Sequence, residues 1–201
     1  MNNKESILTR IRENLAKGED RFPMPDIDLN GIRYDDPVSQ FAETLQSVGG
    51  RLVNCAPEDD KNLLIKGLFP KAGLILSDVP GLSISTLHPD NIADPHELKA
   101  LDLTIVQGHL GVAENACVWL PQTSRLRAHY FIAEHLVILL DASQIVQNMH
   151  EAYERIADDG YDFGVFISGP SKTADIEQAL VVGAHGARSA TVILTHHIGR
   201  H

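Results

Sequence analysis

The sequence contains only two cysteines in 201 residues, Cys55 and Cys117, and they form no Cys-x-x-Cys pair. Iron–sulfur clusters are normally held by several cysteine thiolates, so this chain cannot hold one alone. Both cysteines fall in segments that we expect to be strands. A buried, unreactive thiol is therefore the expected role of each.

Basic residues are also scarce, since 17 Lys and Arg face 27 Asp and Glu and give a formal net charge of −10. No Lys/Arg cluster offsets this balance, which argues against nucleic-acid binding. Apolar runs are much shorter than the roughly 20 residues that span a bilayer. The opening MNNKESILTRIRENL has no signal-peptide core. We therefore expect a cytoplasmic protein without a membrane span.

Two regions differ in their patterning. Within residues 1–36, Ile7, Leu8, Ile11 and Leu15 have helical spacing, and the following stretch to residue 36 is rich in acids, prolines and glycines without periodicity. We expect a helix followed by an extended arm, which could wrap its own domain or reach a partner. Residues 37–201 are expected to form a single α/β domain.

Short apolar runs alternate with amphipathic segments after residue 36. The expected strands are 51–56, 73–77, 103–107, 115–121, 136–140, 164–168 and 191–195, and the expected helices follow Asp36, Pro57, Ser143 and Thr173. Several strands are continuous apolar runs, which is typical of strands covered on both faces. We predict a mostly parallel sheet in a three-layer α/β sandwich. Ligands bind such sheets beyond the carboxyl ends of the strands, so we expect a site near loops 108–114 and 168–173.

The stretch FISGPSKTADIEQALVVGAHG (residues 166–186) resembles a phosphate loop but lacks the glycine that a P-loop places before its lysine. Pro170 also removes one backbone amide. An anion could still bind Gly169, Ser171, Lys172 and Thr173 at the start of the expected helix. The alternative is structural, with Thr173 as the helix cap and Asp175 beside the helix dipole.

Four further residues are candidates for chemistry or binding. Glu114 could be a nucleophile or general base, or a buried hydrogen-bond acceptor that pins its turn. Arg125 and Arg127 could bind a carboxylate or phosphate, although surface arginines are common. His185 could face a ligand or the end of a helix. The histidines lack a recognisable ligand spacing, so no metal site is expected.

The segments SGPSKTADIEQALVVGAHG (168–186) and GVAENACVWLP (111–121) resemble the LUD-domain family. The first follows the family signature almost residue for residue. The second corresponds to a family segment Gly-Ile-Ala-Glu-Thr-Gly-Thr-Val, in which Glu114 is retained and Asn115-Ala116-Cys117 replaces Thr-Gly-Thr. The similarity extends from about Val38 to Leu194.

The resemblance implies a fold like that of CoA transferases, ribose-phosphate isomerases and glucosamine-phosphate deaminases. It also implies an accessory role in a bacterial system that oxidises L-lactate to pyruvate, with iron–sulfur clusters on partner subunits and none in this chain. The ligand would be a small carboxylate or a phosphate-containing molecule. Two alternatives stay open: an acyl or CoA transferase or sugar-phosphate isomerase that uses Glu114, and a metabolite sensor without catalysis.

Overall fold

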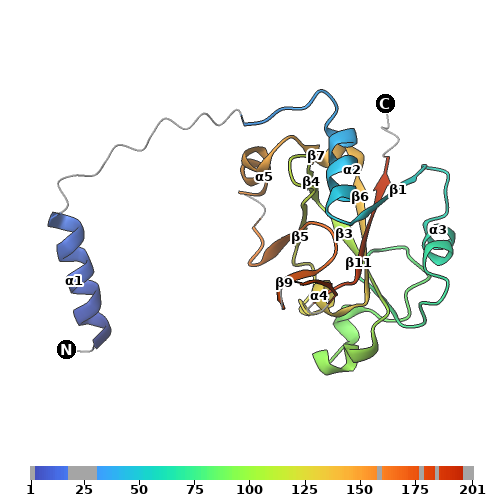
Figure 1. Ribbon diagram of the computed structural model, residues 1–201. Coiled ribbons are helices and arrows are strands. Elements are labelled where there is room, and N and C mark those ends of the chain that lie inside the picture. Colours follow the sequence, from blue (N-terminus) through green and yellow to red (C-terminus); the bar gives the residue numbers. More distant parts are fainter. Residues whose placement is uncertain (1–2, 18–30, 158–159, 177–178, 184–185, 197–201) are drawn as a thin grey trace.

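A five-stranded parallel sheet forms the centre of the computed structural model (Figure 1). The structure describes residues 3–17, 31–157, 160–176, 179–183 and 186–196. Within these ranges, only the backbone is described at 15–17, 173–176 and 179–182. The strand order is β1 (Arg51–Cys55), β11 (Ser189–Thr195), β6 (His135–Asp141), β3 (Leu103–Gly108) and β2 (Ile75–Ser77). All neighbouring pairs in this sheet are parallel.

A second, mixed sheet of four short strands lies against the first. Its order is β7 (Ile145–Val146), β4 (Leu110–Val112), β5 (Val118–Pro121) and β8 (Gly164–Ile167). β4 pairs in parallel with β7, and β5 is antiparallel to both β4 and β8. A separate antiparallel hairpin joins β9 (Lys172–Ile176) to β10 (Ala179–Val182).

The helices are short and mostly connect strands. The α-helices are α1 (Asn3–Lys17), α2 (Pro37–Ser47), α3 (Lys61–Leu68), α4 (His129–Ile132) and α5 (Met149–Ile156), and the 3-10 helices are η1 (Pro89–Asn91), η2 (Pro95–Ala100) and η3 (Ala142–Gln144). No helix in the described ranges is long and apolar enough to cross a membrane.

Some helices start at the N-cap residue predicted from the sequence, and others do not. Asp36 caps α2 as predicted, because its carboxylate accepts from the backbone amides of Val38 and Ser39 at 3.0 Å. The helix expected after Ser143 is displaced. Ser143 lies in η3, Ile145 starts β7, and α5 begins only after its cap, Asn148.

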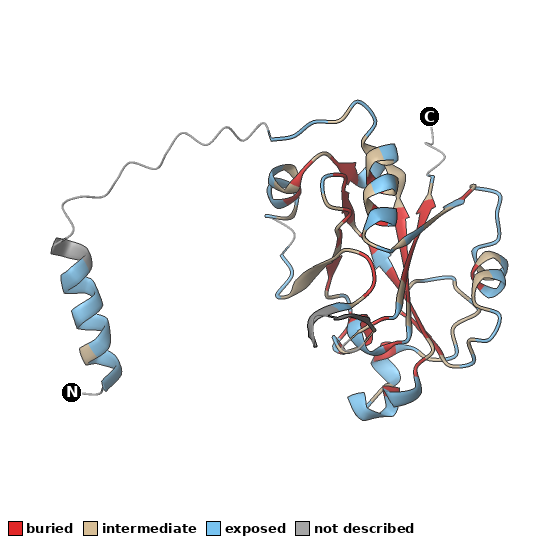
Figure 2. Ribbon diagram, viewed as in Figure 1, coloured by how far each residue is buried: buried red, intermediate tan, exposed pale blue. Residues whose placement is uncertain are grey.

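Both faces of the parallel sheet are buried (Figure 2). One face packs on α3 through a cluster that includes Ile65, Ile105 and Leu139. The other packs on α2 and on the second sheet, and α5 covers the far side of that second sheet. The predicted α/β class with a mostly parallel, doubly covered sheet is therefore confirmed. One of the covering layers is itself largely β-structure.

The helix predicted after Thr173 is wrong, because residues 172–182 form the β9–β10 hairpin. Thr173 pairs with Val181 and Ile176 with Ala179 across the two strands. The β-branched residues of this segment suit a pleated strand, and pairing across the hairpin stabilises it where sequence spacing alone also permits a helix. The strand expected at 115–121 starts later, at Val118, which leaves Cys117 outside it.

α1 is a helix as predicted, and in Figure 1 it lies apart from the α/β body. The part of the arm that the structure describes contacts its own domain. Tyr34 N donates to Gln147 Oε1 at 2.7 Å, and Asn148 Nδ2 donates to the carbonyl of Ile32 at 3.0 Å. The boundary between arm and domain at residue 36 stays a prediction.

Candidate functional site

The two motif segments of the sequence meet at one contact. Ser168, directly after β8, donates its hydroxyl to the carbonyl of Asn115 at 2.7 Å. Asn115 in turn accepts from the amide of Cys117 through its side chain, which tightens the turn between β4 and β5. Ala116, at the centre of that turn, is fully buried and has a φ of 54°. The structure thus brings Asn115 and Cys117 next to Ser168, whereas a shared ligand site between loops 108–114 and 168–173 stays a prediction.

Glu114 lies at the start of α5. Its backbone amide donates to the carbonyl of Gln147 at 3.1 Å, and its Oε2 accepts from the amide of Met149 at 3.0 Å. A hydrogen bond from a carboxylate to a free amide in the first turn stabilises that end of the helix. Glu114 is therefore a hydrogen-bond acceptor, as its structural alternative predicts, but its side chain is exposed and bonds to α5, so the predicted burial is wrong.

Cys117 lies beside these groups. Burial raises the pKa of its thiol, a hydrogen bond with Ser168 lowers it, and the nearby charge of Glu114 raises it further. Burial likewise raises the pKa of the Cys55 thiol. A thiol with a raised pKa is mostly protonated at neutral pH and is a poor nucleophile, which agrees with an inert role for both cysteines.

The predicted anion loop sits against the end of α2. Lys172 Nζ comes within 3.8 Å of the place where a side chain on Gly49 would begin, just beyond the helix C-terminus. Helix C-termini carry negative partial charge, so Lys172 is well placed to stabilise that end. The amide of Ser171 donates to the carbonyl of Ala187, and no helix N-terminus follows it. Anion binding by Gly169, Ser171 and Lys172 stays a prediction, without the helix amides that supported it.

The backbone conformation at position 169 favours glycine. Its φ is 66°, and an added Cβ would come within 3.0 Å of both the carbonyl oxygen and Cγ2 of Val48. We expect Gly169→Ala to lower the free energy of unfolding by about 1–3 kcal/mol, because left-handed backbone costs alanine energy and the Val48 carbonyl must move. Urea denaturation would measure this change.

Gly81→Ala is the matched control, since Gly81 has a φ of 81° and open space around its missing side chain. The difference between the two variants gives the contribution of the Val48 contact. Equal losses in both variants would contradict a tight contact at Gly169.

The remaining predicted residues are not gathered at Glu114 in the described part of the chain. Arg127 is exposed and places its guanidinium 4.9 Å from the centre of the Phe163 ring. Arg125 lies on the rim of two small surface cavities. The side chains of Thr173 and Asp175, and the whole of His185, lie outside the described residues.

A cleft with a volume of about 950 Å³ lies at the carboxyl edge of the parallel sheet. Cys55, Gly108, Asp141 and Thr195 contribute to its wall from the ends of four parallel strands. The sequence predicts a ligand near loops 108–114 and 168–173 at this edge; Gly108 and His109 of the first loop line the cleft, and no described residue of the second loop does. Polar residues at the ends of β6 and β11, Asp141 and Thr195, were the sequence signal that could have located this cleft.

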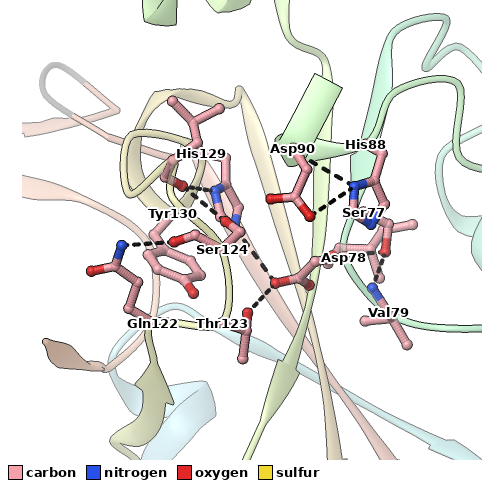
Figure 3. Close-up of polar contacts among 12 residues, drawn as sticks. Ser77, Asp78, Val79, His88, Asp90, Gln122, Thr123, Ser124, His129 and Tyr130 are labelled. Atoms are coloured by element: carbon pink, nitrogen blue, oxygen red, sulfur yellow. Dashed lines mark hydrogen bonds and ion pairs between the residues drawn. The ribbon is translucent and has the colours of Figure 1, made fainter. Parts of the chain in front are cut away.

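A buried polar pair forms beside this edge (Figure 3). Thr123 Oγ1 donates to Asp78 Oδ2 at 2.5 Å, and His129 Nε2 lies 3.9 Å from the same oxygen. His129 Nδ1 contacts the carbonyl of Leu126. His129 is fully buried and Asp78 is nearly so. Burial lowers the pKa of His129, while Asp78 and the Leu126 carbonyl act in the opposite direction.

Burial, the largest effect on His129, favours a neutral imidazole, whereas the Leu126 and Asp78 oxygens that face its two nitrogens favour the charged form. With the proton on Nδ1 shared with Leu126, Nε2 is an acceptor facing a carboxylate oxygen, and neither Nε2 nor Asp78 Oδ1 has a hydrogen-bond partner among the described residues. Tyr130, the next residue along α4, donates its hydroxyl to the Pro121 carbonyl at 3.0 Å. In the same ranges, no three His, Cys, Asp or Glu side chains group closely enough to bind a metal ion.

Comparison with known proteins places this chain in a family. A model of the LUD domain matches residues 95–195. Lactate utilization protein C of an Exiguobacterium species is 32% identical, and the alignment covers 96% of each chain. This chain belongs to the LUD-domain family. The matched range includes β3, β6 and β11 of the parallel sheet and both motif segments.

Two other similarities are more limited. The uncharacterized protein NMB1437 of Neisseria meningitidis is 45% identical over 65 residues, a match that spans only 28% of its length. The crystal structure of a DUF162 family protein from Deinococcus radiodurans superimposes with a TM-score of 0.63. It is 17% identical and the alignment covers 79% of this chain and 96% of the other, so it supports the fold alone.

The LUD motif explains one backbone feature. The family segment has glycine where this chain has Ala116, and the φ of 54° at that position is a conformation that glycine adopts without strain. Ala116 therefore adopts a left-handed conformation that is strained for alanine.

Proposed function

We propose that this LUD-domain protein is a component of a lactate-utilising system, where it acts beside subunits that carry iron–sulfur clusters. The similarity to Lactate utilization protein C, which extends over nearly the whole of both chains, is the observation that carries this proposal. The chain has only two cysteines, and both are free thiols on separate parts of the fold. Any cluster in such a system would therefore be held by a partner.

Growth of a deletion strain tests the role in lactate utilisation. We expect a strain of the source organism that lacks this gene to lose growth on L-lactate as sole carbon source, and to grow normally on pyruvate. Plasmid-borne wild-type protein should restore growth. A deletion strain that grows on lactate at the wild-type rate would overturn the proposal.

Affinity purification tests the partners. The tagged chain, isolated from lactate-grown cells, should carry along proteins with iron and acid-labile sulfide and with the visible absorption of iron–sulfur clusters. Recovery of the chain without any iron-containing protein would remove this part of the proposal and leave the growth phenotype to be explained otherwise.

The proposal includes a small anionic ligand at Gly169, Ser171 and Lys172. Lys172 is exposed and is the basic side chain of this loop. If a carboxylate or phosphate binds there, Lys172→Gln should weaken binding by about tenfold, which corresponds to one lost charge-assisted hydrogen bond. Isothermal titration with lactate, pyruvate and inorganic phosphate would measure this effect. Unchanged affinity in the variant would place the anion elsewhere.

Glu114→Gln separates a structural role from a transferase reaction. Because Glu114 accepts from Met149 at the start of α5, we expect the variant to lose about 0.5–1 kcal/mol of stability and to support growth on lactate like wild type. Thermal unfolding and the complementation assay measure the two effects. A Glu114-linked acyl or CoA adduct in mass spectrometry, together with lost growth in the variant, would favour the transferase.

A further inference from the structure

We infer that the cleft at the carboxyl edge of the parallel sheet binds an uncharged, hydroxyl-rich ligand of about the size of a nucleoside. The cleft has a volume of about 950 Å³, within the range of sites for cofactors and drug-sized ligands. Lactate and pyruvate have only a few heavy atoms and would leave most of it empty. This inference does not depend on the proposed role in lactate utilisation.

The lining of the cleft comes from strand ends of the parallel sheet and from the segments beside them. The ends of β1, β3, β6 and β11 line it, together with residues 56, 57, 59–62 and 79–82. Open α/β sheets bind their ligands in this position because the loops beyond the strand ends are held by the sheet beneath them. The location therefore supports binding before any side chain is considered.

The charge of the cleft disfavours an anion. Among the described residues that line it, three carboxylates, Asp59, Asp60 and Asp141, stand against one lysine, Lys61. The other titratable lining groups are Cys55, whose thiol has a raised pKa, and the histidines His109 and His196. A phosphate or carboxylate entering here would meet more negative than positive charge.

The start of α3 cannot serve as a phosphate site. Asp60 Oδ1 accepts from the amides of Asn62 at 2.8 Å and Leu63 at 3.4 Å, so two amides in the first turn of this helix are already bonded to a carboxylate. Asp59 Oδ2 accepts from the amide of Ala56 at 2.8 Å in the turn just before. Both acids therefore stay fixed at the cleft and neutralise the positive end of the helix.

Two amide side chains are held so that each offers one defined group. Gln107 Nε2 donates to the carbonyls of Leu139 at 2.9 Å and Gly108 at 3.1 Å, which leaves its Oε1 as an acceptor. Asn62 Oδ1 accepts from the amide of Ile84 at 3.0 Å, which leaves its Nδ2 as a donor. Their orientation is set by these backbone contacts and not by a ligand.

The combination of fixed carbonyl and carboxylate acceptors with a fixed amide donor suits hydroxyl groups, because a hydroxyl both donates and accepts. Carboxylates at strand ends bind the ribose hydroxyls of nucleotides in other α/β folds. A nucleoside or a free sugar would provide this chemistry without the phosphates that the cleft excludes.

Binding assays with four probes test the inference on the full-length protein. We expect adenosine to raise the melting temperature and to give a saturable isotherm in titration calorimetry, whereas L-lactate and inorganic phosphate should not bind in this cleft. Ribose separates the two sources of hydroxyl groups: binding of ribose as well indicates that the sugar suffices, and binding of adenosine alone indicates a nucleoside site. Failure of both adenosine and ribose to bind would overturn the inference.

A matched pair of variants places the ligand. Asn62→Asp keeps the acceptor for Ile84, removes the donor and adds a negative charge, and it should weaken binding of the hydroxylated probe at least about fivefold. Asn91→Asp is the same substitution at a residue that lines two other surface cavities, and it should leave the affinity for the probe unchanged. Equal affinity in both variants would show that the probe binds outside this cleft, and would overturn the assignment even if the role in lactate utilisation holds.

Discussion

Phe41→Ala is expected to lower the free energy of unfolding by about 3–5 kcal/mol, the largest loss that we predict for a single substitution in this protein. Phe41 lies on α2 with 0% of its surface exposed, in the cluster that joins α2, the parallel sheet and the second sheet. Its ring reaches Gly111 of β4, where an added Cβ would lie 3.4 Å from Phe41 Cε2. Alanine would leave a cavity where three layers meet.

Urea or guanidinium denaturation would measure the loss, which is a large fraction of the 5–15 kcal/mol typical of domains. Leu63→Ala is the control, since Leu63 is also on a helix but 69% exposed, and its loss should stay within about 0.5 kcal/mol. If the two variants lost the same stability, the assignment of Phe41 to the core would be wrong.

Acidification is expected to destabilise the protein through His129, the second large effect. Because burial lowers its folded-state pKa, the unfolded chain binds the imidazole proton more tightly. The contribution of His129 is therefore fully present above the unfolded pKa of about 6.5 and is lost as the pH falls through the lower folded pKa. The slope in that window approaches about 1.4 kcal/mol per pH unit at most.

Unfolding free energies measured from pH 8 to pH 5 test this expectation. His129→Asn can still donate to the Leu126 carbonyl but cannot titrate, so the part of the slope due to His129 should vanish. His88→Gln, an exchange at an exposed histidine, should leave the slope unchanged. An identical slope in wild type and His129→Asn would show that other groups control acid stability.

Asp78→Asn gives an independent check on the cause. Asp78 opposes the effect of burial on His129, so its removal should lower the folded pKa of His129 further. The loss of the His129 contribution should then extend to lower pH than in wild type. A window displaced to higher pH in the variant would contradict this electrostatic account.

Local chemistry allowed much of the parallel sheet and its first helix to be predicted. Asp36 followed by Pro37 specifies the start of α2 within a few residues, and the buried parts of β3, β6 and β11 are continuous apolar runs. The motif segments around Glu114 and Ser168 also predicted the family. These features depend on residues that are close in sequence or on local composition, and both are visible in the amino-acid sequence itself.

The rest depends on partners that are distant along the chain. β9 and β10 became strands by pairing with each other, and β4 and β7 are so short that no periodicity marks them. Glu114 meets Met149, 35 positions away, and Thr123 meets Asp78, 45 positions away. The sequence determined which segments are buried and to which family the chain belongs. Only the tertiary structure decided what the candidate residues contact and where the cleft lies, because packing between distant segments decides both.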